Sequence, residues 1–182
     1  STVYSRLFAI REWTNNLDGI VSRKGTIQEL IDESEPLFNN FIDANDSTYS
    51  LIARTRNIEP ADPLSIELVR LGCHNIDAVK AAESIGAFGE WRDQSGINVF
   101  GPDETVPFKY ITCVLKDGNS YAGHIVMVCN NHEATPGMVD LFRMLSSACQ
   151  QIVDNTFFNE SPAALFLRKI IDNTRLTQAY FD

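Results

Sequence analysis

The sequence predicts an α+β domain in which an antiparallel sheet is accompanied by separate helices. Two predicted strand pairs are each joined by a short turn, which is the connection of an antiparallel hairpin and not of a parallel βαβ unit. The helical patterns lie before, between and after these pairs. With 182 residues, of which 44% are hydrophobic and 10% aromatic, the chain is long and apolar enough to bury a core. We therefore expect one domain with helical extensions at both ends.

Residues 1–25 predict an N-terminal helix with a short heptad pattern. Its apolar seam, with Thr14 in the one polar slot, consists of Val3, Leu7, Ile10, Leu17 and Val21. Phe8 and Trp13 fall outside this seam. Two interpretations stay open, namely an amphipathic helix packed on its own domain and a helix that pairs with its copy in a second chain.

A second helix and a hairpin are expected next. Thr26 is a favourable N-cap, and Glu29 three residues later completes a capping box. The helix should end near Pro36, because a proline disfavours helical backbone in the residue before it. The runs 37–42 and 48–55 predict a β-hairpin, since the residues between them, Asp-Ala-Asn-Asp-Ser, favour Asx turns.

The middle of the chain contains two further helical patterns and an irregular stretch. Asp62-Pro63 combines an N-cap with a proline at the first helical position, and Gly72 is a typical residue after a helix end. A second helix is expected at 75–85. Residues 88–104 predict a loop with one short strand at 98–100.

The last part of the chain has the strongest local signals. Asp117-Gly118 predicts a hairpin turn between strands at 110–115 and 121–129. The second of these strands is apolar nearly throughout, which is typical of a central strand covered on both faces. Thr135-Pro136 begins a long amphipathic helix that reaches Val153, and Ser161-Pro162 begins a final helix.

Charge and composition exclude several classes of function. Fifteen basic against 24 acidic side chains give a net charge of −9, so the chain lacks the cationic surface that binds nucleic acid or anionic membranes. No apolar run is long enough to span a bilayer and the N-terminus lacks the form of a signal peptide, so we expect a cytoplasmic protein. In that compartment we expect buried thiols, and no disulfides, at Cys73, Cys113, Cys129 and Cys149.

Several segments resemble a known family of sensory domains. They are Thr26-Ile-Gln-Glu-Leu-Ile, Leu37-Phe-Asn-Asn with Asp46 opening the turn, Leu51-Ile-Ala-Arg-Thr, Asp62-Pro63 before a helix ending in Leu71-Gly72, and Gly123-His-Ile-Val-Met-Val with the helix after it. Together, over about 26–155, they resemble the N-terminal sensory domain of PucR/CdaR-like bacterial transcriptional regulators. The order of elements likewise resembles PAS and GAF domains, whose five- or six-stranded antiparallel sheet holds a ligand pocket beneath helices.

The resemblance implies a division of the chain into three parts. Residues 1–25 would be the N-terminal helix, 26–157 the GAF/PAS-like sensory domain, and 158–182 a linker helix toward an output domain. In the family, that output domain binds DNA through a helix-turn-helix. The sequence contains no such motif, so we expect a sensory part of a longer regulator.

Polar and aromatic side chains near a sheet face are the candidates for binding a ligand, because a pocket needs a few polar groups to orient its occupant. They are Arg54, Trp91, Arg92, Tyr110, Tyr121 and His124. Either arginine could pair with a carboxylate or phosphate. For each residue, the alternative is an exposed or purely structural side chain.

The remaining titratable residues offer little for catalysis. Cys73-His74 cannot supply four tetrahedral metal ligands, so we expect a buried thiol beside an exposed histidine and no metal or other cofactor. A tight Asp117-Gly118 turn would place Cys113 near Gly123 and bring it toward His124, which is the arrangement of a thiol nucleophile. The alternative is a core cysteine on the other face of the sheet.

These observations favour a non-enzymatic signal-input domain. We expect it to bind a small ligand or partner, to form a homodimer, and to pass the change through its terminal helices. Two alternatives stay open. One is a small thiol-based redox enzyme that uses Cys113 or Cys129, and the other is a ligand-free dimerisation domain.

Overall fold

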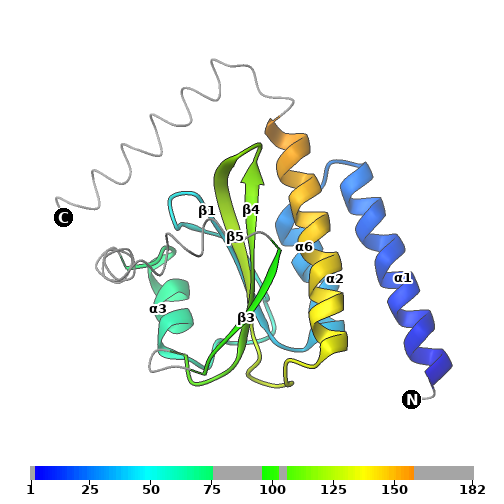
Figure 1. Cartoon of the computed structure of the whole chain (residues 1–182), viewed down its shortest axis with the longest axis horizontal. Helices are drawn as coiled ribbons and strands as arrows, with labels where there is room; N and C mark the ends of the chain where they lie inside the picture. Colours follow the sequence, from blue (N-terminus) through cyan, green and yellow to red (C-terminus); the bar gives the residue numbers. More distant parts are fainter. Residues whose placement is uncertain (1–2, 76–95, 103–105, 158–182) are drawn as a thin grey trace.

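The computed structural model describes residues 3–75, 96–102 and 106–157. Within these ranges the helices are α1 (Val3–Ser22), α2 (Ile27–Phe38), α3 (Pro63–Leu71) and α6 (Pro136–Phe157). The strands are β1 (Phe41–Asp46), β2 (Leu51–Arg54), β3 (Ile97–Phe100), β4 (Tyr110–Asp117) and β5 (Ser120–Val128). Figure 1 shows α1, α2 and α6 on one side of the sheet and α3 on the other. The domain is therefore α+β, as the sequence predicts.

The five strands form one open antiparallel sheet in the order β2-β1-β5-β4-β3. β5 lies at the centre, which confirms the prediction from its apolar sequence. The Asp117-Gly118 turn between β4 and β5 also forms as expected, with Gly118 in the left-handed region at φ 57°. β2 and β3 are the edges.

The first hairpin forms, but its boundaries differ from the prediction. The segment expected to be a loop, residues 43–47, mostly lies inside β1, where it pairs with β2 on one side and β5 on the other. The turn follows it instead, and Asp46 Oδ1 accepts the backbone N–H groups of Thr48 at 2.8 Å and Ser50 at 3.0 Å. Pairing on both sides outweighs the turn preference of the Asp and Asn residues.

α2 begins at the predicted capping box but continues past Pro36. Thr26 Oγ1 accepts from Glu29 N at 3.2 Å, and Glu29 Oε2 accepts from Thr26 N at 2.8 Å. The helix reaches Phe38 and ends at Asn39, which is in the left-handed conformation. Phe38 is fully buried, and its ring contacts Trp13 and Phe142 edge-on, so burial of this side chain stabilises the last turn.

α1 divides into a buried half and an exposed half. Trp13, predicted to lie off the seam, is 4% exposed, and its Nε1 donates to Ser34 Oγ at 3.0 Å. Leu17 and Val21 of the seam are buried as well. At the other end of the helix Leu7 is 59% exposed. The first interpretation of this helix, packing on its own domain, therefore holds for its C-terminal half.

α3 has the predicted boundaries. Asp62 Oδ1 accepts from Ser65 N at 2.8 Å, and Gly72 ends the helix with φ 74°. The helix expected at 75–85 and the one expected at 158–182 lie outside the described residues, except for position 75. Among the described helices, none combines the length and the apolar character that crossing a membrane requires.

Candidate functional site

The two faces of the sheet differ in chemistry. In β1, Ile42 and Ala44 point into the large apolar core beneath the helix layer. Phe41 packs with Leu64 and Val69 of α3 on the opposite face. Since successive strand residues alternate between faces, Asp43 and Asn45 share the face of Phe41. In β5, His124 lies opposite Asn45 in register and belongs to that same face.

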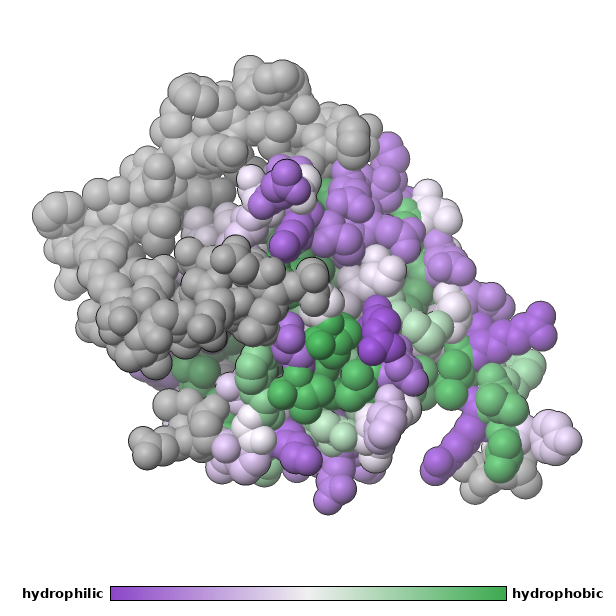
Figure 2. All heavy atoms as spheres, viewed as in Figure 1, coloured by the Kyte–Doolittle hydropathy of each residue, from purple (hydrophilic) through white to green (hydrophobic). Residues whose placement is uncertain are grey.

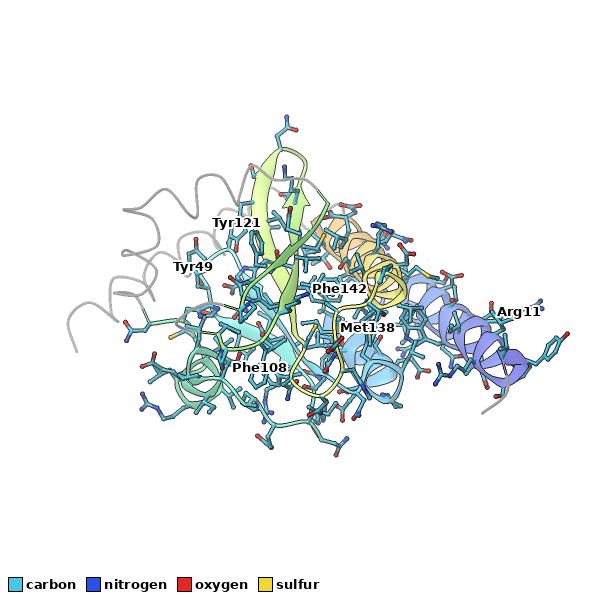
Figure 3. The ribbon with its side chains drawn as sticks, turned by 60° about the horizontal axis from the view of Figure 1, so that its bottom comes forward. Arg11, Tyr49, Phe108, Tyr121, Met138 and Phe142 are labelled. Atoms are coloured by element: carbon cyan, nitrogen blue, oxygen red, sulfur yellow. The ribbon has the colours of Figure 1, made fainter. Side chains whose placement is uncertain are left out.

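Seven residues form what we call the polar cluster on this face. They come from β1, β5, the turn after β1 and the ends of α3, and they are Asp43, Asn45, Tyr49, Asp62, His74, Tyr121 and His124. The side chains of Asp43, Asn45, Asp62 and His124 are at most 3% exposed. Figure 3 shows Tyr49 and Tyr121 on the same side of the ribbon.

A chain of hydrogen bonds links four of these residues. Asn45 Nδ2 donates to Asp43 Oδ1 at 2.6 Å and lies 3.4 Å from His124 Nε2. His124 Nδ1 lies 2.5 Å from the Tyr121 hydroxyl. In this orientation of the Asn45 amide, Nδ2 is the donor and His124 Nε2 the acceptor, so that the ring proton lies on Nδ1. The ring then donates to Tyr121.

Aromatic rings lie beside this series of hydrogen bonds. Tyr49 lies 6.1 Å from Tyr121 and 6.2 Å from His124, measured between ring centroids. The His74 ring stacks on His124 at 6.0 Å. His74 reaches this position because Ser50 and Cys73 form an isolated β-bridge and His74 N donates to Tyr49 O at 3.0 Å.

The cluster is electrostatically costly. Burial, together with a smaller contribution from the nearby Asp62, raises the pKa of Asp43 to about 7, although the hydrogen bond from Asn45 acts in the opposite direction. Burial lowers the pKa of His74, which keeps that ring neutral near pH 7. Within the described ranges neither Asp43 nor Asp62 forms an ion pair.

Two buried acceptor atoms in the cluster have no hydrogen-bond partner, namely Asn45 Oδ1 and Asp62 Oδ2. Most buried polar atoms in proteins are hydrogen-bonded, and each one left without a partner costs about 1–3 kcal/mol. Ordered water or another bound molecule is the usual partner of such atoms.

The structure brings two of the sequence-predicted site residues, Tyr121 and His124, into the cluster. Tyr110 lies on the same face of the sheet, farther along, where it stacks on Phe100 at 5.5 Å. Arg54 pairs in register with Asp43, but its Nη1 donates to the neighbouring carbonyl of Thr55 at 3.1 Å. The other two candidates, Trp91 and Arg92, lie outside the described residues.

Sequence reasoning missed most of the cluster. Asp43 and Asn45 were expected in a turn, Asp62 only as a helix cap, and His74 as an exposed side chain. His74 is instead partly buried, and Cys73 beside it is half-buried. The spacing of Phe41, Asp43 and Asn45 is the one signal that could have placed both polar residues on a single strand face.

Of the two arrangements that the sequence left open for Cys113, the neighbourhood with His124 does not form, and the position in the core does. A bulge between Leu115 and Lys116 shifts the register, so Leu115 lies opposite Gly123 and Cys113 opposite Ile125. Cys113 therefore points into the helix-side core, on the other face from His124.

The environment of the thiols opposes ionisation. Burial raises the pKa of Cys113, raises that of Cys129 to about 11, and raises that of Cys149 further, whereas a thiolate nucleophile needs a lowered pKa. In the part of the chain that the structure describes, no group of three metal-ligating side chains occurs. Comparisons of the chain with protein-family models and with curated proteins found no match.

Proposed function

We propose that this chain is a signal-input domain that binds a small molecule at the polar cluster. The observation that carries the proposal is the pair of buried acceptors without partners, Asn45 Oδ1 and Asp62 Oδ2, on a face bordered by aromatic rings. A stable core rarely keeps such atoms unless another molecule satisfies them. The topology and the resembling segments support a PAS/GAF-like sensory domain of the kind found in PucR/CdaR-like transcriptional regulators.

The strands offer a physical route from the site to the helices. In β1, Asp43 and Asn45 face the cluster while Ile42 and Ala44 pack in the core under the helices. In the same way β5 carries His124 on one face and Ile125 and Met127 on the other. A ligand that shifts these strands therefore also shifts the packing beneath the helix layer.

Two glutamines connect the helices α2 and α6 to the sheet by hydrogen bonds. Gln28 of α2 bonds both the N–H of Arg54, at 3.0 Å, and its carbonyl, at 2.7 Å. Gln150 of α6 holds Lys116 of β4 through the same two backbone groups, at 2.9 and 2.6 Å. Movement of β2 is thus coupled to α2, and movement of β4 is coupled to α6. α1 packs against both of these helices.

The test is a screen of melting temperature and binding heat against small metabolites of every charge class. A binding compound should raise the melting temperature of the wild type, since a ligand that prefers the folded state stabilises it. The shift should be lost in His124→Gln and retained in the matched variant His132→Gln, because His132 is exposed and lies outside the cluster. If every binder affects both variants alike, the polar cluster is not the site.

A second candidate function, dimerisation through α1, is favoured by the exposed half of that helix. Its first two turns expose four apolar side chains by 59–85%, namely Val3, Tyr4, Leu7 and Phe8. Figure 2 shows hydrophobic side chains on the surface at this end of the molecule, at lower right. The heptad spacing on the same helix suits a second copy of the chain.

Light scattering tests this candidate with a matched pair of variants. We expect a dimer for the wild type and for Ile66→Asp, whose side chain is 50% exposed on α3, and a monomer for Leu7→Asp. A wild-type chain that stays monomeric would remove dimerisation from the function.

A further inference from the structure

We propose that the polar cluster takes an organic cation with N–H donors, a primary ammonium or guanidinium group held between Asp43 and Asp62. This inference rests on the proposed ligand-binding function and adds the chemical class of the ligand. Three features of the cluster lead to it: the kind of atom left without a partner, the sign of the local charge, and the surrounding rings.

The unpartnered atoms in the cluster are both acceptors. Asn45 uses its amide nitrogen toward Asp43 and His124, which leaves Oδ1 without a donor. Asp62 Oδ1 caps α3 by accepting from Ser65 N, which leaves Asp62 Oδ2 without a donor as well. Acceptors are completed by donors, and an ammonium group carries three while a guanidinium carries five.

The charge of the cluster is negative and is not balanced within it. Asp43 is 3% and Asp62 0% exposed, and the two carboxyl groups repel each other. His74 is neutral near pH 7, and His124 Nε2 is an acceptor in the hydrogen-bond chain. None of the seven cluster residues is a lysine or arginine, so an anionic ligand bound to these residues would meet carboxylates with no counter-charge from the cluster itself.

The rings fit the same occupant. Tyr49 and Tyr121 lie 6.1 Å apart between ring centroids, at a tilt of 37°, and both rings lie 6.2 Å from that of His124. A cation near an aromatic face is attracted by the ring quadrupole, and this attraction is stronger in a desolvated site. A primary amine would thus receive charge-assisted hydrogen bonds on one side and ring contacts on the other.

The experiment compares probes that share a shape and differ in charge. Isothermal titration of the full chain at about pH 8, where alkylammonium groups stay protonated, uses ethylamine, putrescine, agmatine and phenethylamine. Each is compared with the neutral alcohol of similar shape, and phenethylamine also with 3-phenylpropanoate. At least one amine should bind more than about tenfold tighter than its neutral and anionic counterparts.

Three isosteric variants locate the binding. Asp43→Asn and Asp62→Asn should each weaken amine binding at least about tenfold, because each removes one carboxylate that a desolvated cation needs. Both should fold, since asparagine keeps the shape and is also a good N-cap. Asp18→Asn makes the same change of net charge at an exposed position of α1 and should leave the affinity unchanged.

The outcomes separate this inference from the function it rests on. Binding of an alcohol or the carboxylate in preference to every amine, or amine binding that survives both cluster substitutions, overturns the cation while leaving the proposed function standing. Absence of binding by every probe and every metabolite of the wider screen overturns both.

Discussion

Replacing Asp43 by asparagine should stabilise the protein, and the gain should grow with pH. Asp43 is buried beside Asp62, and its pKa is raised to about 7, whereas an aspartate in an unfolded chain titrates near 3.9. Between these values the folded chain holds a proton that the unfolded chain releases. The free energy of unfolding of the wild type therefore falls as pH rises from about 4 to about 7.

The size of the effect follows from the shift in pKa. A rise of roughly 3 units at about 1.4 kcal/mol per unit corresponds to a penalty of about 4 kcal/mol above pH 7 and none below pH 4. Asp43→Asn removes the ionisable group, so its advantage over the wild type should rise from near zero to at most about 4 kcal/mol over this range. In Asp43→Asn, the side-chain amide of Asn45 can rotate by about 180°, so that Asn45 Oδ1 accepts a hydrogen bond from the new amide nitrogen at position 43.

Urea unfolding followed by tryptophan fluorescence measures this difference at a series of pH values from about 4 to about 8. His74, whose lowered pKa makes stability rise with pH, is present in both proteins and cancels in the difference. Asp18→Asn, on the exposed face of α1, should follow the wild type throughout. A gap between Asp43→Asn and wild type that is constant with pH, or a variant that is less stable at pH 8, would refute the reasoning.

Three further predictions concern the packing around the site and the thiols. Gly123→Ala should destabilise the fold by about 2–4 kcal/mol in urea unfolding, because the added carbon would clash with the Asn45 carbonyl oxygen at φ 154°, and an unchanged midpoint would contradict this. Trp13→Phe should cost about 1–3 kcal/mol through the lost hydrogen bond to Ser34, whereas Asp18→Asn at an exposed position of the same helix should change stability by less than about 0.5 kcal/mol. Titration of the native protein with a thiol reagent should find Cys113, Cys129 and Cys149 slow to react until the chain unfolds. Fast reaction of any of these three thiols in the folded protein would support the alternative of a thiol-based enzyme.

Much of the fold was predictable because its signals are local. The capping box at Thr26 and Glu29, the cap at Asp62 and the turn at Gly118 each depend on a few adjacent residues, and all three form. The apolar run of β5 predicted a central strand because only a strand covered on both faces tolerates such a sequence. These features do not require knowledge of what packs against them.

The candidate site was predictable only in part, through His124 and Tyr121. Both lie on a recognisable strand, but which face they share, and with whom, depends on register. One bulge at Leu115/Lys116 moves Cys113 opposite Ile125 and so separates it from His124. A shift of one residue exchanges the faces of a strand, and no local pattern encodes it.

The sequence by itself determined the class of the fold, the helix caps, the second hairpin and the net acidic charge. The tertiary structure decided that Asp43 and Asn45, residues with a strong preference for turns, lie in the buried strand β1. Hydrogen bonding to two neighbouring strands and burial of Phe41 and Ile42 outweigh the local preference there. That placement puts Asn45 Oδ1, a buried acceptor without a hydrogen-bond partner, next to the buried carboxyl group of Asp43, and the proposal of a cationic ligand rests on these two residues together with Asp62.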